Sequence, residues 1–360
     1  MQKKLALVMV VKDEEKGLEK AILSARPFVD EIHISVDSKS SDKTLEIAKR
    51  FTSNVKVFDW CDDFAKARND AHADVKTDWI LFLDGHEYIE KCEKLQEYLN
   101  LDCDGLLTTV KMENGTEFRN PRIYKTGVQF HGSYHERSQC KKTALCTGVV
   151  IKHNRTEGQN ISAIQERDKQ RDYLLPKSMK QALAENPKDL RALFHFALWY
   201  QTKGDYRNTL KYQNLFLKWS PASSDKYYIL FNRSMLFMGK NKLFRAFWAI
   251  NKANEAEPNR WETEKMKGLI FFARGSYEKA LTCFVDSFNN NKQDYAYKPL
   301  KRDDAGTWNL IGECFYRRGV YSKASTAFGL ASQGTQDKVL KDFFKQRQQL
   351  MVNILIGQKK

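Results

Sequence analysis

The sequence predicts an α/β sheet domain followed by an all-α domain of helical repeats. The first observation is that short apolar, β-branched runs alternate with charge-periodic helical stretches over about the first 160 residues. The second is that strand patterns are missing from about residue 161 onward, where self-similar helical pairs follow. The third is the composition: 42% hydrophobic and 29% charged residues in a chain of 360 are typical of a folded protein with two or three domains.

Each element of the first half has its own pattern. The segment 5–11 is continuously apolar, as a strand buried on both faces should be. Further strands are expected at 31–36, 55–58 and 79–83, and helices at 13–26, 44–51 and 64–73. This alternation predicts a mostly parallel sheet, in which ligands bind at the carboxyl ends of the strands. Asp37, Asp59 and Asp84 all stand at that edge.

The second half contains copies of the tetratricopeptide pattern. The clearest copy spans residues 308–331 and another spans 271–287, each with Gly-x-Tyr between its two helices. A third copy begins at Tyr200, and a degenerate fourth lies at 246–258. Small residues let the paired helices approach closely, so we expect the aromatic residues to form a continuous core.

The expected domain organisation follows from these patterns. We predict a sheet domain at 1–160, a connecting helix at 161–185, repeats at 186–336, and a capping helix with a tail at 337–360.

The net charge of +15 is unevenly distributed. Residues 1–160 carry 25 Lys and Arg against 26 Asp and Glu, a net charge of −1, whereas residues 161–360 carry 35 against 19, a net charge of +16. A surplus of this size predicts a polyanionic partner such as nucleic acid, lipopolysaccharide or an anionic membrane surface. Lysines that only keep a repeat array soluble are the alternative.

The sequence excludes an integral membrane protein, because no stretch approaches the roughly 18 to 20 apolar residues that cross a bilayer. Charged residues follow the apolar segment 5–11 at once, so a buried first strand is expected in place of a signal peptide. Seven scattered cysteines without a Cys-x-x-Cys pair indicate reduced thiols in a cytoplasmic protein. A peripheral position at the inner membrane surface and a homo-oligomer are left open.

A candidate metal site follows the strand at 79–83. Asp84 and His86 can both face one divalent cation if the strand ends in a turn, which Gly85 permits. Asp-Gly is also a common turn sequence. The context strengthens the metal interpretation, because Asp37 ends an earlier strand and Arg68 stands in a nearby helix.

Five motifs, in order and spacing, resemble those of the family 2 glycosyltransferases with a GT-A fold. They are Val10–Glu14, Val29–Asp37, Ser40–Thr44, Asp62–Asn69 and Asp78–Asp84. The fit is closest to the bacterial and viral subgroup that carries tetratricopeptide repeats behind the catalytic domain. The resemblance covers about residues 4–155 and implies a GT-A nucleotide-sugar-binding domain. It also implies an inverting hexosyl- or pentosyltransferase that uses a nucleotide-sugar, expected to be a UDP-sugar, and a divalent metal.

The resemblance also implies roles for individual residues. The residues expected to bind the donor are Val11, Lys12, Glu14, Asp37, Arg68 and Asp84. Asp84 and His86 take the first and last positions of the family's Asp-x-Asp metal motif. The histidine departs from the family pattern, and because imidazole favours transition metals we expect Mn²⁺ to work better than Mg²⁺. Weakened metal binding is the alternative.

Inversion needs a general base, and three residues remain open for that role. Glu87 directly follows the metal motif, while His135 and Glu136 resemble a His-Glu pair that this subgroup places late in the catalytic domain. His135 could instead complete the metal shell, and His153 is a further possible ligand.

The acceptor is also left open. A basic repeat domain fits a long anionic acceptor, either a surface glycan such as lipopolysaccharide or the hydroxymethylated DNA of a phage. A peptide acceptor is an alternative. Another is a degenerate catalytic site on a repeat scaffold that binds a polyanion.

Overall fold

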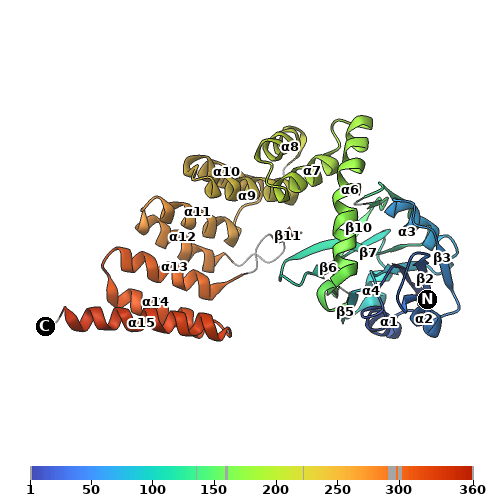
Figure 1. The fold of residues 1–360 in the computed structure, drawn as a ribbon, viewed down its shortest axis with the longest axis horizontal. Helices are drawn as coiled ribbons and strands as arrows, with labels where there is room; N and C mark the ends of the chain where they lie inside the picture. Colours follow the sequence, from blue (N-terminus) through green and yellow to red (C-terminus); the bar gives the residue numbers. More distant parts are fainter. Residues whose placement is uncertain are drawn as a thin grey trace. The chain divides into compact units, whose positions relative to one another are not determined.

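The structure, a computed structural model, describes residues 2–134, 136–158, 161–221, 223–290, 297–298 and 302–358. The chain divides into two compact units, Met1–Phe216 and Leu217–Lys360, which we describe separately (Figure 1). The expected fold class, an α/β domain followed by an all-α repeat domain, is confirmed. The domain limits given above stay predictions.

The first unit contains the sheet and the first helices. Its strands are β1 (Leu5–Val11), β2 (Glu31–Asp37), β3 (Val55–Phe58), β4 (Trp79–Phe82), β5 (Glu87–Cys92), β6 (Gly105–Lys111), β7 (Glu117–Lys125), β8 (Phe130–His131), β9 (Arg137–Ser138) and β10 (Thr143–His153). Its helices are α1 (Leu18–Ala25), the 3₁₀ turn η1 (Arg26–Phe28), α2 (Thr44–Phe51), α3 (Phe64–His72), α4 (Leu95–Leu99), α5 (Arg155–Gly158), α6 (Ile161–Glu185), α7 (Leu190–Thr202) and most of α8 (Tyr206–Trp219).

The main sheet is mixed and has the strand order β3-β2-β1-β4-β7-β6-β10-β5. Parallel ladders join β3 to β2, β2 to β1, β1 to β4 and β6 to β10. Antiparallel ladders join β4 to β7, β7 to β6 and β10 to β5. The predicted parallel arrangement therefore holds for β1 to β4, and the strands that follow add antiparallel pairs that the sequence analysis did not assign.

Strand β1 is buried on both faces, as predicted, and its side chains alternate between two cores. Leu5, Leu7 and Met9 pack in the core that α1 and α2 cover. Ala6 and Val8 face the opposite core, which α3 covers. Because alternate residues of a strand point to opposite faces, β1 contributes side chains to both of these helix-covered layers.

Helix α1 begins five residues later than the sequence predicted. Asp13 adopts a left-handed backbone with φ of 51°, and the Glu14 carbonyl accepts the N–H groups of Gly17 and Leu18. The segment between β1 and α1 is therefore a loop at the carboxyl edge of the sheet, where an expected ligand site lies.

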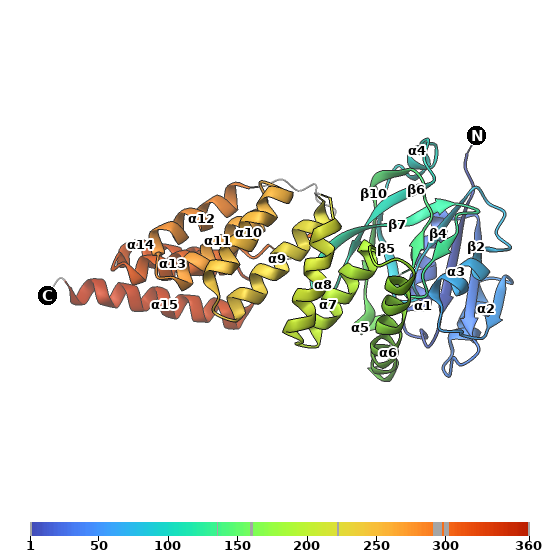
Figure 2. The ribbon, with the colours of Figure 1, turned by 90° about the horizontal axis from the view of Figure 1, so that it is seen from above.

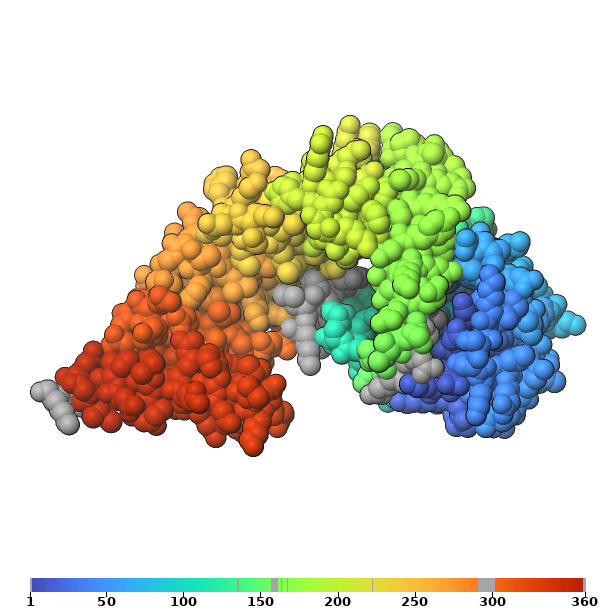
Figure 3. Space-filling view, in the orientation of Figure 1, coloured from blue at the N-terminus to red at the C-terminus, as the bar shows by residue number. Residues whose placement is uncertain are grey.

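The second unit is built from helical pairs. Its helices are α9 (Ser224–Gly239), α10 (Leu243–Ala256), α11 (Trp261–Ala273), α12 (Tyr277–Asn289), α13 (Asp304–Arg317), α14 (Tyr321–Gln333) and α15 (Lys338–Gly357). Each helix from α9 to α15 packs against the next helix in the sequence (Figure 2). The space-filling view shows the same order, from yellow at α9 to red at α15 (Figure 3).

The expected absence of strands after residue 161 holds with one exception in the described part of the chain. This exception is the two-residue strand β11 (Tyr297–Lys298). Most of the segment 289–302, which separates the last two repeat copies, lies outside the described residues.

The predicted repeat copies share a backbone conformation at the turn between their helices. Gly204, Gly275 and Gly319 have φ of 69°, 73° and 73°. Asn241 occupies the matching turn of the degenerate copy, with φ of 54°. Asparagine is among the few residues besides glycine that tolerate this left-handed region, so the degenerate copy keeps the turn.

Small residues also set the helix spacing within two of the copies. A Cβ atom on Gly268 would lie 2.5 Å from a ring carbon of Phe284, and one on Gly312 would lie 2.6 Å from a ring carbon of Phe328. Both phenylalanines are fully buried. The aromatic residues therefore form core, as the sequence predicted.

None of the helices in the described part of the chain is both long and apolar enough to span a bilayer. The structure describes all seven cysteines, and each of them is a free thiol.

We predict that Gly312→Ala lowers the free energy of unfolding by about 1 to 3 kcal/mol, because the added methyl group overpacks the contact with Phe328. Urea denaturation measures the change. Gly239→Ala is the matched control, since a Cβ there meets nothing within 4 Å. Adding Phe328→Leu to Gly312→Ala should restore part of the loss. Equal effects of the two alanine substitutions would contradict the packing argument.

A second prediction concerns His72, which is buried beneath the sheet and hydrogen-bonded to the Tyr124 hydroxyl at 3.0 Å. Burial, assisted by the positive charge of Arg68, lowers the pKa of His72 to about 3. This value lies below the unfolded pKa near 6.5. The contribution of neutral His72 to the free energy of unfolding is therefore fully present above pH 6.5, and it declines as the pH falls toward about 3.

We therefore expect the stability difference between the wild type and His72→Gln to shrink by about 1.4 kcal/mol per pH unit over this range. Urea denaturation at a series of pH values measures it. A difference that does not change with pH would show that His72 is not held neutral.

Candidate active site

A cleft of about 250 Å³ opens at the carboxyl ends of β1, β2 and β4. Its lining includes every residue expected to bind the donor, namely Val11, Lys12, Glu14, Asp37, Arg68 and Asp84. The loop after β1 supplies Lys12 and Glu14, β2 ends at Asp37, and Asp84 follows β4. We call this cavity the first cleft. Asp59, which shares the same sheet edge, accepts a hydrogen bond from the Ser38 hydroxyl and does not line it.

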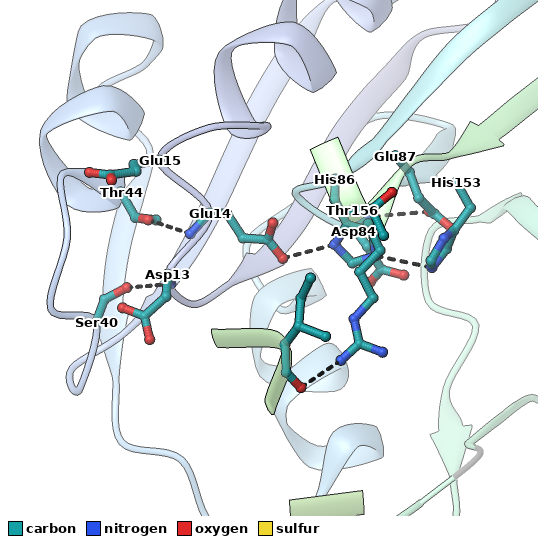
Figure 4. A network of polar contacts seen from close by, with 12 residues as sticks. Asp13, Glu14, Glu15, Ser40, Thr44, Asp84, His86, Glu87, His153 and Thr156 are labelled. Atoms are coloured by element: carbon teal, nitrogen blue, oxygen red, sulfur yellow. Dashed lines mark hydrogen bonds and ion pairs between the residues drawn. The ribbon is translucent and has the colours of Figure 1, made fainter. Parts of the chain in front are cut away.

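The loop after β1 is held by the loop after β2 (Figure 4). The backbone N–H of Asp13 donates to the Ser40 hydroxyl at 2.9 Å, and that of Glu14 donates to the Thr44 hydroxyl at 2.7 Å. In return, the N–H of Ser41 donates to the Asp13 carboxylate at 2.8 Å. The motif at residues 40–44 therefore fixes the shape of the segment that lines the first cleft.

Asp84 lies beside a buried arginine that the sequence analysis did not single out. Arg122 on β7 contacts Glu87 at 2.5 Å and Asp84 at 3.2 Å, and the backbone N–H of Asp84 donates to Glu87 at 3.1 Å. Burial raises the pKa of Glu87 despite the opposing charge of Arg122. For Asp84, burial favours the neutral form, but the charges of Arg122, His86, Arg68 and His153 together outweigh burial and hold the pKa far below its ordinary value. Asp84 is therefore the ionised carboxylate.

His86 contacts protein groups through both ring nitrogens (Figure 4). Its Nδ1 lies 2.9 Å from a carboxylate oxygen of Glu14, and its Nε2 lies 3.1 Å from Nε2 of His153. Burial, with help from His86, lowers the pKa of His153 to about 4. A Cβ on Gly85 would lie 2.6 Å from the Glu14 side chain, so glycine is required for the close approach of Glu14.

The metal expectation fits Asp84 better than His86. The Asp84 side chain is 36% exposed and lines the first cleft, where a cation shared with donor phosphates needs only one or two carboxylates. His86 would have to give up its contact with His153 to offer Nε2. Among the described residues, no group of three or more His, Cys, Asp or Glu side chains is placed to hold a metal. His135, the other expected ligand, lies outside the described residues.

A second cleft of about 430 Å³ lies beside the first and shares Phe64, Arg68 and Asp84 with it. Glu136 lines this second cleft and forms an ion pair with Arg68. Arg68 in turn stacks over the ring of Phe82, with 3.6 Å between the guanidinium carbon and the ring centroid. The structure thus brings Glu136 to the expected diphosphate-binding arginine.

Glu87, the rival candidate for the base, lies elsewhere. Its side chain is fully buried against Arg122 and lines neither of the two clefts. A base must reach the proton that it accepts, so the geometry favours Glu136.

Several lining residues were missed by the sequence analysis. Arg122 lines the second cleft, and the first cleft is lined by Phe58, Trp60, Arg155 and Gln170. The rings of Trp60 and Phe64 form an edge-to-face pair with centroids 4.6 Å apart. In the sequence these two aromatic residues flank the acidic pair 62–63, and this spacing is a signal that could have indicated them. Arg155 and Gln170 come from helices beyond the sheet, and no local motif marks them.

Comparisons with known proteins find relatives of the sheet domain. The model of glycosyl transferase family 2 matches residues 6–153. A TPR repeat-containing protein of Synechococcus elongatus is 33% identical over 141 residues, which cover 37% of this chain and 34% of that protein. An uncharacterized glycosyltransferase of Rickettsia bellii is 35% identical over 91 residues, which cover 25% of this chain and 30% of that protein. Glycosyltransferase SunS of Bacillus phage SPbeta is 27% identical over 198 residues, which cover 50% of this chain and 46% of that protein.

The matched segments span less than half of the length of each of these relatives. Within this chain, however, the family match coincides with the sheet that carries both clefts, from β1 to the end of β10. The sheet domain is therefore similar to glycosyl transferase family 2 over residues 6–153, and tetratricopeptide-like helical repeats follow it in the chain.

Proposed function

We propose that the chain is an inverting glycosyltransferase that moves a sugar from a UDP-sugar to a nucleophilic acceptor. One observation carries the proposal. The residues expected to bind the donor line one cleft, and this cleft shares Arg68 and Asp84 with a second cleft that holds Glu136. A donor and an acceptor could therefore meet at these two residues.

The first cleft has the groups that a nucleoside diphosphate needs. The carboxylate of Asp37 can accept the N3–H of a pyrimidine base, and the planar fork of Arg68 suits a diphosphate. A divalent cation, Mn²⁺ in preference to Mg²⁺, would be held by Asp84 with the donor phosphates and would neutralise charge on the leaving diphosphate.

In the proposed reaction the acceptor oxygen attacks the anomeric carbon. The bond from that carbon to the diphosphate oxygen breaks, and its electron pair stays with the diphosphate. The acceptor proton passes to Glu136. Arg68 contacts Glu136 and lines both clefts, so it would orient the base while it stabilises the leaving group.

The acceptor that we propose is polyanionic, a surface glycan such as lipopolysaccharide or hydroxymethylated DNA. The net charge of +16 on residues 161–360 supports this choice. A peptide is the second candidate. A degenerate scaffold is less well supported, because Asp37, Arg68 and Asp84 stand together in one cleft.

We predict that UDP binds more tightly with Mn²⁺ than in EDTA, and that Asp84→Asn removes this difference because it removes the ionised ligand. Titration calorimetry of the full chain measures both affinities. UDP affinity that is undiminished in EDTA would overturn the role of Asp84 as a metal ligand.

Glu136→Gln should slow sugar transfer by roughly 10² to 10⁴-fold while UDP affinity stays nearly unchanged, because only the proton acceptor is lost. Release of UDP from a panel of UDP-sugars, with water as acceptor, measures the rate. Glu90→Gln is a matched control, since Glu90 lies outside both clefts and pairs with Lys111. If Glu87→Gln caused the specific loss of rate instead, Glu87 would be the base.

A further inference from the structure

We propose that the second cleft binds a phosphate group carried by the acceptor. This inference rests on the proposed function and names the chemistry of the acceptor. Among the described residues, the lining combines five arginines with two carboxylates. The arginines are Arg68, Arg119, Arg122, Arg137 and Arg191, and the carboxylates are Asp84 and Glu136.

The arginines converge from separate parts of the first unit. Arg68 comes from α3, Arg119 and Arg122 from β7, Arg137 from β9 and Arg191 from α7. A run of charge on one helix is usually a solvated face, but here four elements bring guanidinium groups to one cavity. The tertiary fold therefore concentrates positive charge at this place.

Carboxylates contact Arg122, Arg68 and Arg137 of this lining. Asp84 and the buried Glu87 both contact Arg122, and Glu136 contacts Arg68. Asp189 lies 3.6 Å from Arg137, whose side chain is 58% exposed, so solvent screens this pair. The cleft thus presents several guanidinium groups beside Glu136, and such a lining favours an anion.

Two arginine N–H groups of this lining also lack partners among the described residues. The Nε atoms of Arg68 and Arg122 are buried and have no hydrogen-bond partner among the described residues. Glu136 and Glu87 hold these guanidinium groups in place but leave the Nε–H donors available for hydrogen bonds. A ligand that reached them would gain charge-assisted hydrogen bonds.

A phosphate fits this lining better than a carboxylate does. Arginine forks pair with both groups, but a phosphate monoester is a dianion at neutral pH and offers three oxygens to several guanidinium groups at once. Asn120 and Ser138 add neutral polar side chains to the lining. The volume of about 430 Å³ admits a phosphorylated sugar.

The position of Glu136 assigns this phosphate to the acceptor. The donor diphosphate is expected in the first cleft, against Arg68 and Asp84. Arg119, Arg137 and Arg191 line only the second cleft, on the side where Glu136 would take the acceptor proton. An anion held there lies next to the proposed base and not at the nucleotide.

The test uses the full chain saturated with UDP and Mg²⁺, so that the first cleft is filled, and titrates inorganic phosphate by calorimetry. We expect saturable binding that Arg191→Gln weakens at least tenfold and Arg191→Lys weakens less. Arg50→Gln is the matched control, because Arg50 is an exposed arginine of α2 outside both clefts and should leave the affinity unchanged. Thermal unfolding of each variant shows whether it is folded.

Loss of phosphate binding on saturation with UDP would overturn the proposal, because the arginines would then serve the donor. So would equal affinities for wild type and Arg191→Gln. A parallel Arg119→Gln titration keeps the test valid if the Arg191 variants do not fold.

Three further probes identify the chemistry. Glucose 6-phosphate should bind at least as tightly as inorganic phosphate, and acetate at least tenfold more weakly. Acetate that binds equally well would replace the phosphate assignment by a carboxylate. Dimethyl phosphate that binds as tightly as the monoester would support the proposal with a diester as its source.

The titrations also separate this inference from the proposed function. UDP affinity alone tests the donor cleft. A chain that binds UDP but no phosphate refutes only the inference, whereas one that binds phosphate but no UDP refutes the proposed function.

Discussion

The buried guanidinium group of Arg122 is the constraint on which the site depends. It lies inside the domain with Glu87 at 2.5 Å and Asp84 at 3.2 Å, and a buried charge without such partners would cost several kcal/mol. Breaking a pair of this kind typically costs about 3 to 5 kcal/mol. The arrangement fixes the turn after β4, because Glu87 also accepts the backbone N–H of Asp84. A group needed for stability thus keeps Asp84 ionised where the two clefts meet.

The sheet and the repeats could be predicted where local pattern and packing agree. The limits of α2 match the prediction because its apolar face and the turn at 40–43 both mark them. Strand β1 was predicted because its two helix-covered faces require an uninterrupted apolar run. Helix α1 begins later than its periodicity suggested, because the loop at residues 12–17 is held by contacts with residues 40–44, and helical propensity does not register such contacts.

The site was predictable only where a motif lies at a strand end. Asp37 and Asp84 end or follow parallel strands, so topology alone brings them together. The position of Arg122 could not be predicted from strand ends, because β7 pairs antiparallel with β4 and no local sequence pattern indicates this pairing. The contact of His86 with His153 joins residues 67 positions apart, and only the assembled sheet creates it.

Arg68 lines both clefts, and this double role limits how the protein can change its substrates. If the two clefts bind donor and acceptor as proposed, a substitution of Arg68 would alter the recognition of both substrates together. Residues that face one cleft are free of this coupling, such as Trp60 on one side and Arg191 on the other. Divergence among related chains, and efforts to redirect this one, should therefore concentrate at such positions and leave Arg68 in place.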